Sequence, residues 1–303
     1  MKRQLIDFTI IGAQKAGTTS LFKYLNDHPQ VWMPPEKEAP FFSDDEVYNQ
    51  GWEQYFTDYF SGAPNSRLLG KATPHYMCDK KVPSRISKIL PNIKLIAILR
   101  HPIERAFSHY KMWIRWGREK RTFNEAVMQQ LALNELKNAR VFRAEIANDN
   151  KCYIVRGEYG RIMKEYFRFF KRGQLLTIFT DELKNDPILV MKKIYRFIVV
   201  DQEYVPSTIG KVYHVGGFKS RLPFIHKVKK NKAAVLIWET FPIQFRRYFA
   251  YWFKQWNTIS DIGVYDKYIS DENRTKLQDL YQNDIVLLER LIDQSVPWTD
   301  LRG

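Results

Sequence analysis

The sequence predicts an α/β fold in which a central parallel sheet is flanked by helices on both faces. Residues 5–11, 94–99 and 175–179 form apolar, β-branched runs of the kind found in strands buried on both sides. Segments with helical periodicity separate these runs, and strands that alternate with helices favour parallel pairing with covered faces. A glycine loop follows the first run directly. We therefore expect a three-layer, P-loop-like architecture.

Helices are expected between and after the strands. Apolar residues at helical spacing after the glycine loop predict a helix over residues 19–26. Pro102 suits the first turn of a helix that follows the second strand. Further helices are predicted near residues 52–60 and over 159–170, 187–198 and 271–294.

The simplest partition is a single domain over residues 1–303. Within it, residues 223–262 are dense in Lys, Arg, Phe, Tyr and Trp and predict a basic helical elaboration. Its aromatic stretch, residues 241–256, could pack on the core or could make a peripheral membrane contact.

Charge and cysteine content indicate which partners and which cellular compartment to expect. The chain has 48 Lys and Arg against 33 Asp and Glu, a formal charge of +15, which attracts polyanions, nucleotides or an anionic membrane. Two distant cysteines, Cys78 and Cys152, indicate neither a metal cluster nor a disulfide framework. An apolar strand that begins by Leu5 leaves no room for a signal peptide, and the apolar runs are too short for a bilayer. We expect a cytoplasmic protein.

The loop at residues 12–20, with the sequence GAQKAGTTS, has the glycine spacing of a phosphate-binding loop. Backbone N–H groups at the start of the following helix, supported by the helix dipole, attract a phosphate. In an NTP-binding loop the lysine directly follows the second glycine. Here Thr18 occupies that position and Lys15 lies inside the loop, so the lysine approaches the anion from another side. The loop therefore suits a ligand whose leaving phosphate needs a positive charge at the bridging oxygen.

A second anion site is predicted in the sequence RHPIERAFSHY. Arg100 ends a buried strand, where ligands of open α/β sheets collect. Ser108 lies eight residues later, about two turns into the next helix. The two side chains could face one crevice and bind a second phosphate, one by charge and one by its hydroxyl.

These two motifs together resemble the cofactor signature of the sulfotransferases, which use 3′-phosphoadenosine 5′-phosphosulfate (PAPS). The resemblance implies that Arg100 and Ser108 grip the 3′-phosphate, and that a late basic loop closes over the nucleotide. It implies that the glycine loop cradles the 5′-phosphosulfate. The residues that this resemblance assigns to the donor are Gln14, Lys15, Ala16, Gly17, Thr18, Thr19, Ser20, Arg100, Ser108, Lys219, Ser220 and Arg221.

Weaker motifs resemble the branch that contains heparan sulfate N- and O-sulfotransferases and many bacterial relatives. They are Lys37-Glu38-x-Pro40-Phe41-Phe42, Thr73-Pro74-x-Tyr76, Gly157-x-Tyr159 and a closing helix near Trp298. This branch implies a saccharide or glycan acceptor, with a small alcohol or a lipid still open. We expect no specific nucleic-acid partner. Oligomeric state is left undetermined.

The resemblance also suggests a mechanism without a metal, since a sulfuryl group carries less negative charge than a phosphoryl group. Catalysis should then rest on in-line positioning and charge stabilisation. Lys15 is the candidate that stabilises the leaving phosphate oxygen. In the resembling branch a glutamate stands two positions before Thr-Pro-x-Tyr, but this chain has Lys71 there. The candidates for the general base are Lys71, His75, Glu36 and Glu38, and the sequence does not choose among them.

Two other functions remain open at this point. The first is a P-loop kinase or NTPase, because residues 175–182 resemble a strand ending in a Mg²⁺-binding acid; the simpler reading is that Thr180 or Asp181 caps the next helix. The second is a non-catalytic binder of nucleic acid or acidic glycans. Basic and aromatic residues interleave at 227–232 and 246–248 and could contact phosphates or sulfates.

Overall fold

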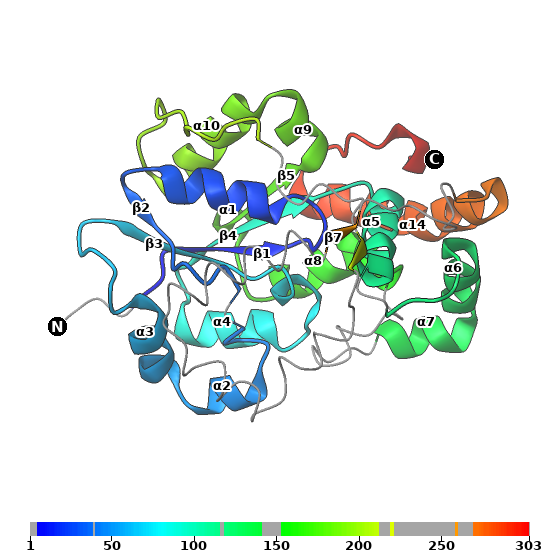
Figure 1. The fold of residues 1–303 in the computed structure, drawn as a ribbon, viewed down its shortest axis with the longest axis horizontal. Helices are drawn as coiled ribbons and strands as arrows, with labels where there is room; N and C mark the ends of the chain where they lie inside the picture. Colours follow the sequence, from blue (N-terminus) through cyan, green and yellow to red (C-terminus); the bar gives the residue numbers. More distant parts are fainter. Residues whose placement is uncertain are drawn as a thin grey trace.

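A computed structural model describes residues 5–38, 40–115, 118–140, 153–211, 219–220, 258–259 and 269–302. Five parallel strands form the central sheet in the order β2-β3-β1-β4-β5 (Figure 1). Their bounds are β1 Phe8–Gly12, β2 Val31–Trp32, β3 Leu68–Ala72, β4 Lys94–Leu99 and β5 Leu175–Phe179. The expected parallel sheet is confirmed; β4 and β5 have the predicted bounds, and β1 begins at Phe8, three residues later than predicted, and ends one residue later.

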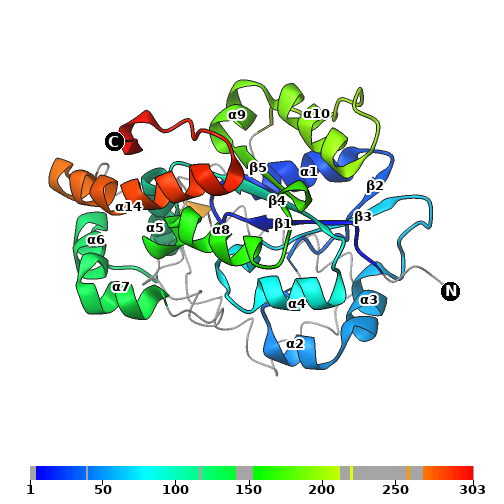
Figure 2. The ribbon, with the colours of Figure 1, turned by 180° about the vertical axis from the view of Figure 1, so that it is seen from behind.

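Helices cover both faces of this sheet, as expected for a three-layer fold. On one face lie α1 (Thr18–Asp27), α9 (Thr180–Asn185) and α10 (Pro187–Ile198) (Figures 1 and 2). On the other lie α2 (Asp45–Asn49), α3 (Trp52–Phe60), α4 (Val82–Ile89) and α8 (Tyr159–Phe167). Near the end of the sheet toward which the strands point are α5 (Pro102–Arg115), α6 (Phe123–Leu131), α7 (Leu133–Arg140) and α14 (Asp271–Ile292).

The topology places two loops at one edge of the sheet. β1 lies between β3 and β4. After β1 the chain forms β2 and β3 on one side of this strand, and then β4 and β5 on its other side. In open α/β sheets such a switch point leaves a crevice at the carboxyl ends of the strands, where ligands bind. The glycine loop follows β1 and Arg100 follows β4, so both predicted anion sites lie at this end of the sheet.

The last helix closes this edge. α14 packs along α8, and Gly160 allows the contact, because a Cβ there would lie 2.1 Å from the backbone oxygen of Asp284. After α14 the chain returns to β5, where Trp298 packs edge-on against Phe179. The Trp298 indole nitrogen donates to the Asp181 carboxylate at 3.1 Å. The C-terminal segment is therefore part of the wall around the strand ends.

Most of the predicted basic elaboration, residues 223–262, lies outside the described residues. The two residues described within it, Thr258–Ile259, form a short strand, β7, which pairs antiparallel with β6 (Lys219–Ser220). Within the described ranges no helix is long and apolar enough to cross a membrane. Cys78 is a free thiol, and Cys152 lies outside the described residues.

Candidate active site

The glycine loop has a backbone shape that requires its glycines. Gly17 has φ 105°, a left-handed value that favours glycine. A Cβ on Gly12 would lie 2.6 Å from Cβ of Met77, so only glycine fits where β1 meets the loop. Lys15 also has a positive φ, 73°, which is uncommon for a residue with a side chain and is typical of functional loops.

Two contacts from outside the loop hold it in place. The Thr180 hydroxyl at the end of β5 lies 2.6 Å from the Ala16 carbonyl oxygen and 3.0 Å from that of Leu99. Arg156, which is buried, donates from Nη1 to the side-chain oxygen of Gln14. Gln14 and Ala16 therefore contribute to the site by joining the loop to its surroundings.

The start of α1 offers backbone donors to an anion. Gly17 is the N-cap residue and has no side chain to accept from the first N–H groups, and the first turn carries no acidic residue. Backbone N–H groups at such a helix start bind anions. The Thr18 hydroxyl at the same place lies 3.4 Å from Nζ of Lys37, and Thr19 is half-buried beside it.

The second predicted site lies along α5. The Tyr159 hydroxyl donates to the Arg100 carbonyl oxygen at 2.8 Å, which fixes the backbone where β4 ends. Arg100 forms an exposed ion pair with Glu104 at 3.2 Å, one that a phosphate could replace. Glu104, Ser108 and Arg115 are spaced along one partly exposed stripe of α5 that starts beside Arg100.

Electrostatics links the two sites. Burial lowers the pKa of Lys15, and the charges of Arg115, Arg100, Lys37 and Arg105 act in the same direction, so that together they bring this pKa to about 8. Cations from the end of β4, from α5 and from the segment after β2 thus act on the one ammonium group of the glycine loop. Such a gathering of positive charge is suited to a ligand with several negative charges.

The lowered pKa of Lys15 predicts that donor binding takes up a proton. A bound phosphate favours the charged lysine and raises its pKa, so between the two pKa values the complex holds more protons than the free protein. At pH 8.5 we expect uptake of a substantial fraction of a proton when adenosine 3′,5′-bisphosphate binds. Affinity should then fall as the pH rises above about 8.

Isothermal titration at pH 8.5 in two buffers of different ionisation enthalpy measures this uptake. The Lys15→Met protein should lose most of it, and Lys71→Met should retain it. Equal apparent enthalpies in both buffers for the unmodified protein would contradict the assignment.

Lys71 is buried, and its amine is bonded to a backbone carbonyl. Its side chain is 2% exposed, and Nζ donates to the Glu36 carbonyl oxygen at 2.6 Å and lies 4.8 Å from the ring centre of Tyr59. Burial lowers the pKa of Lys71 to about 8, against the opposing charges of Glu36 and Glu38. At neutral pH the amine is therefore mostly protonated and ties the segment after β2 to the sheet.

His75 is half-buried at the start of the short 3-10 helix η1 (Tyr76–Cys78), directly after β3. Burial lowers its pKa to about 4; the charges of Arg156 and Lys37 act in the same direction, and that of Glu38 opposes them. The imidazole is thus neutral at pH 7 but weakly basic. A proton acceptor with so low a pKa is poorly matched to neutral pH.

The Glu38 carboxylate is linked to the start of α1 through the side chain of Lys37. Nζ of Lys37 lies 3.0 Å from Oε1 of Glu38 and 3.4 Å from the hydroxyl of Thr18. One ammonium group therefore separates the carboxylate from the start of α1. The Glu38 side chain is 48% exposed, so an acceptor molecule can reach it.

The late basic loop is only partly described. Lys219 and Ser220 form β6, whose backbone lies against α5, the helix that carries Ser108. Arg221 lies outside the described residues. The backbone position agrees with a loop near the predicted 3′-phosphate site, and the roles of the three side chains stay predictions.

Thr180 and Asp181 do not cap α9 with their side chains, contrary to the expectation from the sequence. Phe179 is the N-cap residue, and the Glu182 carboxylate accepts from its backbone N–H at 3.0 Å. Thr180 instead contacts the glycine loop, and Asp181 accepts from Trp298. In the part of the chain that the structure describes, no three His, Cys, Asp or Glu side chains gather as they would around a metal ion.

Sequence reasoning missed several contributors to the site. Lys37, Arg115 and Arg156 bring positive charge to it, and Thr180 holds the loop. Arg156 immediately precedes the motif Gly157-x-Tyr159, which is a signal that could have drawn attention to it. Lys37 likewise begins the motif Lys37-Glu38-x-Pro40-Phe41-Phe42, whereas Arg115 and Thr180 are brought to the site by tertiary contacts.

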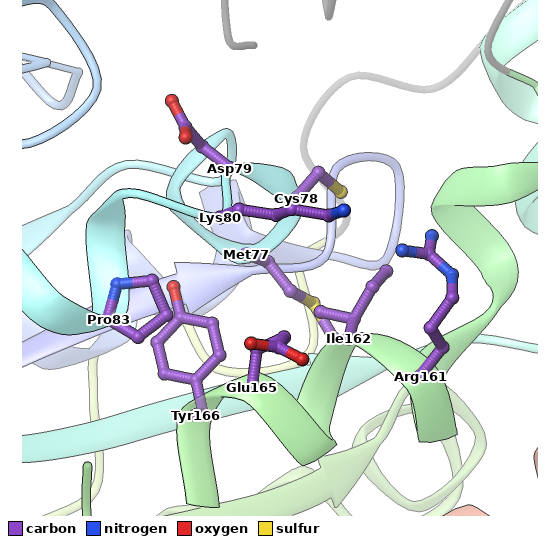
Figure 3. Close-up of a pocket in the computed structure, with 9 residues that line it drawn as sticks. All are labelled: Met77, Cys78, Asp79, Lys80, Pro83, Arg161, Ile162, Glu165 and Tyr166. Atoms are coloured by element: carbon purple, nitrogen blue, oxygen red, sulfur yellow. The ribbon is translucent and has the colours of Figure 1, made fainter. Parts of the chain in front are cut away.

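A separate small pocket lies between η1 and α8 (Figure 3). The Cys78 sulfur, the Lys80 ammonium and the Arg161 guanidinium lie along one side of it. The space inside it that water-sized molecules can occupy is about 10 Å³, room for about one water molecule, so it cannot hold a nucleotide. Its lining includes none of the predicted site residues, so this pocket is separate from the candidate nucleotide site at the strand ends.

Comparisons with known proteins point to one protein family. Residues 5–212 match the family model described as the sulfotransferase domain. Membrane-associated sulfotransferase kil1 of Dictyostelium discoideum is 38% identical over 114 residues, which cover 37% of this chain and 24% of that protein. Human heparan sulfate glucosamine 3-O-sulfotransferase 5 is 28% identical over 196 residues, 65% of this chain and 54% of that protein.

The chain thus spans only about a quarter to a half of the length of these relatives. A sulfotransferase from Alicyclobacillus acidocaldarius has a similar structure with TM-score 0.67 and 23% identity, covering 96% of this chain and 97% of that one, which supports the fold. The family match covers more than half of the sequence and includes both anion-binding motifs. This chain therefore belongs to the sulfotransferase domain family.

Proposed function

We propose that the protein transfers a sulfuryl group from PAPS to a hydroxyl or amine of a saccharide or glycan. One observation carries this proposal: several positive charges act on Lys15 at the carboxyl ends of β1 and β4. They belong to Arg100, to Lys37 and to two arginines of α5, Arg105 and Arg115. A donor with phosphate groups at both ends of an adenosine would fill such a crevice. The family assignment supports the same chemistry.

In this proposal the glycine loop and the start of α1 bind the 5′-phosphosulfate, and Arg100 with Ser108 binds the 3′-phosphate. Lys15 stabilises the charge that develops on the bridging phosphate oxygen as the S–O bond breaks. Preorganised charge at the leaving oxygen is among the largest contributions that an enzyme can make to such a transfer.

We further propose Glu38 as the general base that takes the proton from the acceptor. It is exposed, it is a carboxylate, and one lysine side chain links it to Thr18 at the donor site. Lys71 is the less suitable candidate, because its amine is buried, mostly protonated and bonded to the Glu36 carbonyl. His75 is less suitable because of its low pKa.

The saccharide acceptor rests on similarity to the named relatives, one of which, the human 3-O-sulfotransferase, carries heparan sulfate in its name. The positive charge around Lys15 and the +15 net charge of the chain are compatible with an acidic glycan. A lipid or phenolic acceptor is a competing proposal. The cytoplasmic location and the membrane contact of residues 241–256 stay predictions.

A transfer assay with ³⁵S-labelled PAPS tests this function. Purified protein is incubated without added metal with three acceptor classes: glycosaminoglycan oligosaccharides, lipid alcohols and phenols. We expect label in the saccharide fraction, with a rate at least tenfold above the other two classes. Transfer to another acceptor class alone would support sulfotransferase activity and refute the proposed saccharide acceptor. Binding of ATP with Mg²⁺ and no affinity for adenosine 3′,5′-bisphosphate would refute the donor and favour a nucleoside triphosphatase.

A further inference from the structure

Arg105 is a fully buried arginine that lies on α5 between the two predicted 3′-phosphate ligands, Arg100 and Ser108. Its relative exposure is 0%. Nη2 donates to the Tyr153 carbonyl oxygen, but Nε and Nη1 have no hydrogen-bond partner in the described part of the chain. A buried charge with unmet donors is unfavourable unless something nearby compensates it.

The buried carboxylates of the neighbouring segments already have other partners. Glu158 accepts from Arg140 and from Arg161. Glu119 accepts from Arg121 and from the hydroxyl of Tyr153. Among the described residues, therefore, no carboxylate forms an ion pair with Arg105.

His109, one turn further along α5, adds another donor and no acceptor. The Trp113 indole N–H donates to Nε2 of His109 at 2.8 Å, so the proton of the neutral ring is on Nδ1. Nδ1 is buried and has no partner within the described ranges. Burial holds the pKa of His109 well below its usual range, and the charges of Arg156 and Arg105 act in the same direction. This part of the interior is thus rich in positive charge and hydrogen-bond donors.

The field of Arg105 reaches the donor site, since its charge is one of those that act on Lys15. We propose that Arg105 sets the affinity for the sulfated nucleotide by its buried charge rather than by direct contact. The empty protein carries an uncompensated guanidinium, and the phosphates of the bound donor compensate it. This inference rests on the proposed donor and adds a residue that tunes its affinity.

Replacement of Arg105 by methionine separates this role from a purely structural one. Methionine keeps much of the length and removes the charge, and a buried ionic side chain can often be replaced by an apolar one without loss of stability. We expect the melting temperature of empty Arg105→Met to be no lower than that of the unmodified protein, despite the lost bond to Tyr153. The Kd for adenosine 3′,5′-bisphosphate should rise roughly tenfold or more, because a charge within the protein acts over about 10 Å with little screening.

Two further variants make the result specific. Arg105→Lys keeps the charge and should bind the bisphosphate within about threefold of the unmodified protein. Arg168→Met removes the same charge from an exposed position on the C-terminal side of α8 and should change neither quantity.

Thermal unfolding and titration calorimetry at one fixed salt concentration provide both readouts. A lower melting temperature for empty Arg105→Met, an unchanged Kd, or equal losses of affinity in Arg105→Met and Arg105→Lys would each overturn the proposal. If the unmodified protein itself bound no bisphosphate, the proposed donor would fail, and this role of Arg105 would fail with it. A loss of affinity in Arg105→Met, with normal binding by the unmodified protein, is a different result and concerns Arg105 alone.

Discussion

Replacement of Glu38 by glutamine is expected to reduce kcat by roughly 10²–10⁴-fold, the usual contribution of a positioned general base. Glutamine keeps the size and polarity of the side chain but cannot accept the acceptor's proton. Donor binding should stay within about threefold, because Glu38 is linked to the donor site only through Lys37. Steady-state rates with labelled PAPS and calorimetry with adenosine 3′,5′-bisphosphate measure the two quantities separately.

Two variants serve as controls for Glu38→Gln. Glu36→Gln makes the same change two residues earlier, at an exposed side chain, and should reduce kcat less than threefold. Lys71→Met removes the buried amine that holds the Glu36 carbonyl and should lower stability by about 1–3 kcal/mol while reducing kcat less than tenfold. A large loss in Lys71→Met together with a nearly normal rate in Glu38→Gln would transfer the role of base to Lys71.

Replacement of Lys15 by methionine should reduce kcat by roughly 10²–10³-fold, as expected when one charge at the leaving oxygen is removed. Unlike Glu38→Gln, this variant should also bind adenosine 3′,5′-bisphosphate at least about tenfold more weakly, because Lys15 contacts the same anion in the ground state. The pH dependence of donor binding above pH 8 should disappear as well, since burial and the nearby positive charges lower the pKa of Lys15 to about 8 in the empty protein.

Lys23→Met is a matched control on α1. Lys23 is exposed, and its Nζ lies 5.8 Å from the ring centre of Phe22, away from the loop. Its replacement should change neither rate nor affinity by more than about twofold. Retention of a tenth or more of the activity by Lys15→Met would mean that Lys15 does not stabilise the leaving group.

Runs of apolar residues predicted the strands β1, β4 and β5, but they did not predict β3. That strand contains Gly70 and Lys71 in the sequence LLGKA, which lacks both the apolar run and the alternation of a buried strand. Tertiary packing explains both residues. A Cβ on Gly70 would lie 2.2 Å from the Phe8 ring, and Lys71 is buried because the segment after β2 supplies a carbonyl for its amine.

The two anion-binding motifs could be read from the sequence because each is contiguous and follows a recognisable strand. The contacts of Arg156 and Thr180 with the glycine loop could not be predicted, even though Arg156 adjoins a motif, because they join segments 142 and 164 residues apart. The choice among the candidate bases likewise depended on which side chain faces the loop. Lys71 precedes the motif Thr73-Pro74-x-Tyr76, which drew attention to it, yet its amine is buried against the Glu36 carbonyl. Glu38, in contrast, is linked to Thr18 through Lys37.

A crystal structure with adenosine 3′,5′-bisphosphate bound tests the central claim most directly. Density for the 5′-phosphate should lie against the backbone of residues 15–19, and density for the 3′-phosphate between Arg100 and Ser108. A nucleotide bound elsewhere, or one whose 3′-phosphate is distant from Arg100, would contradict the account.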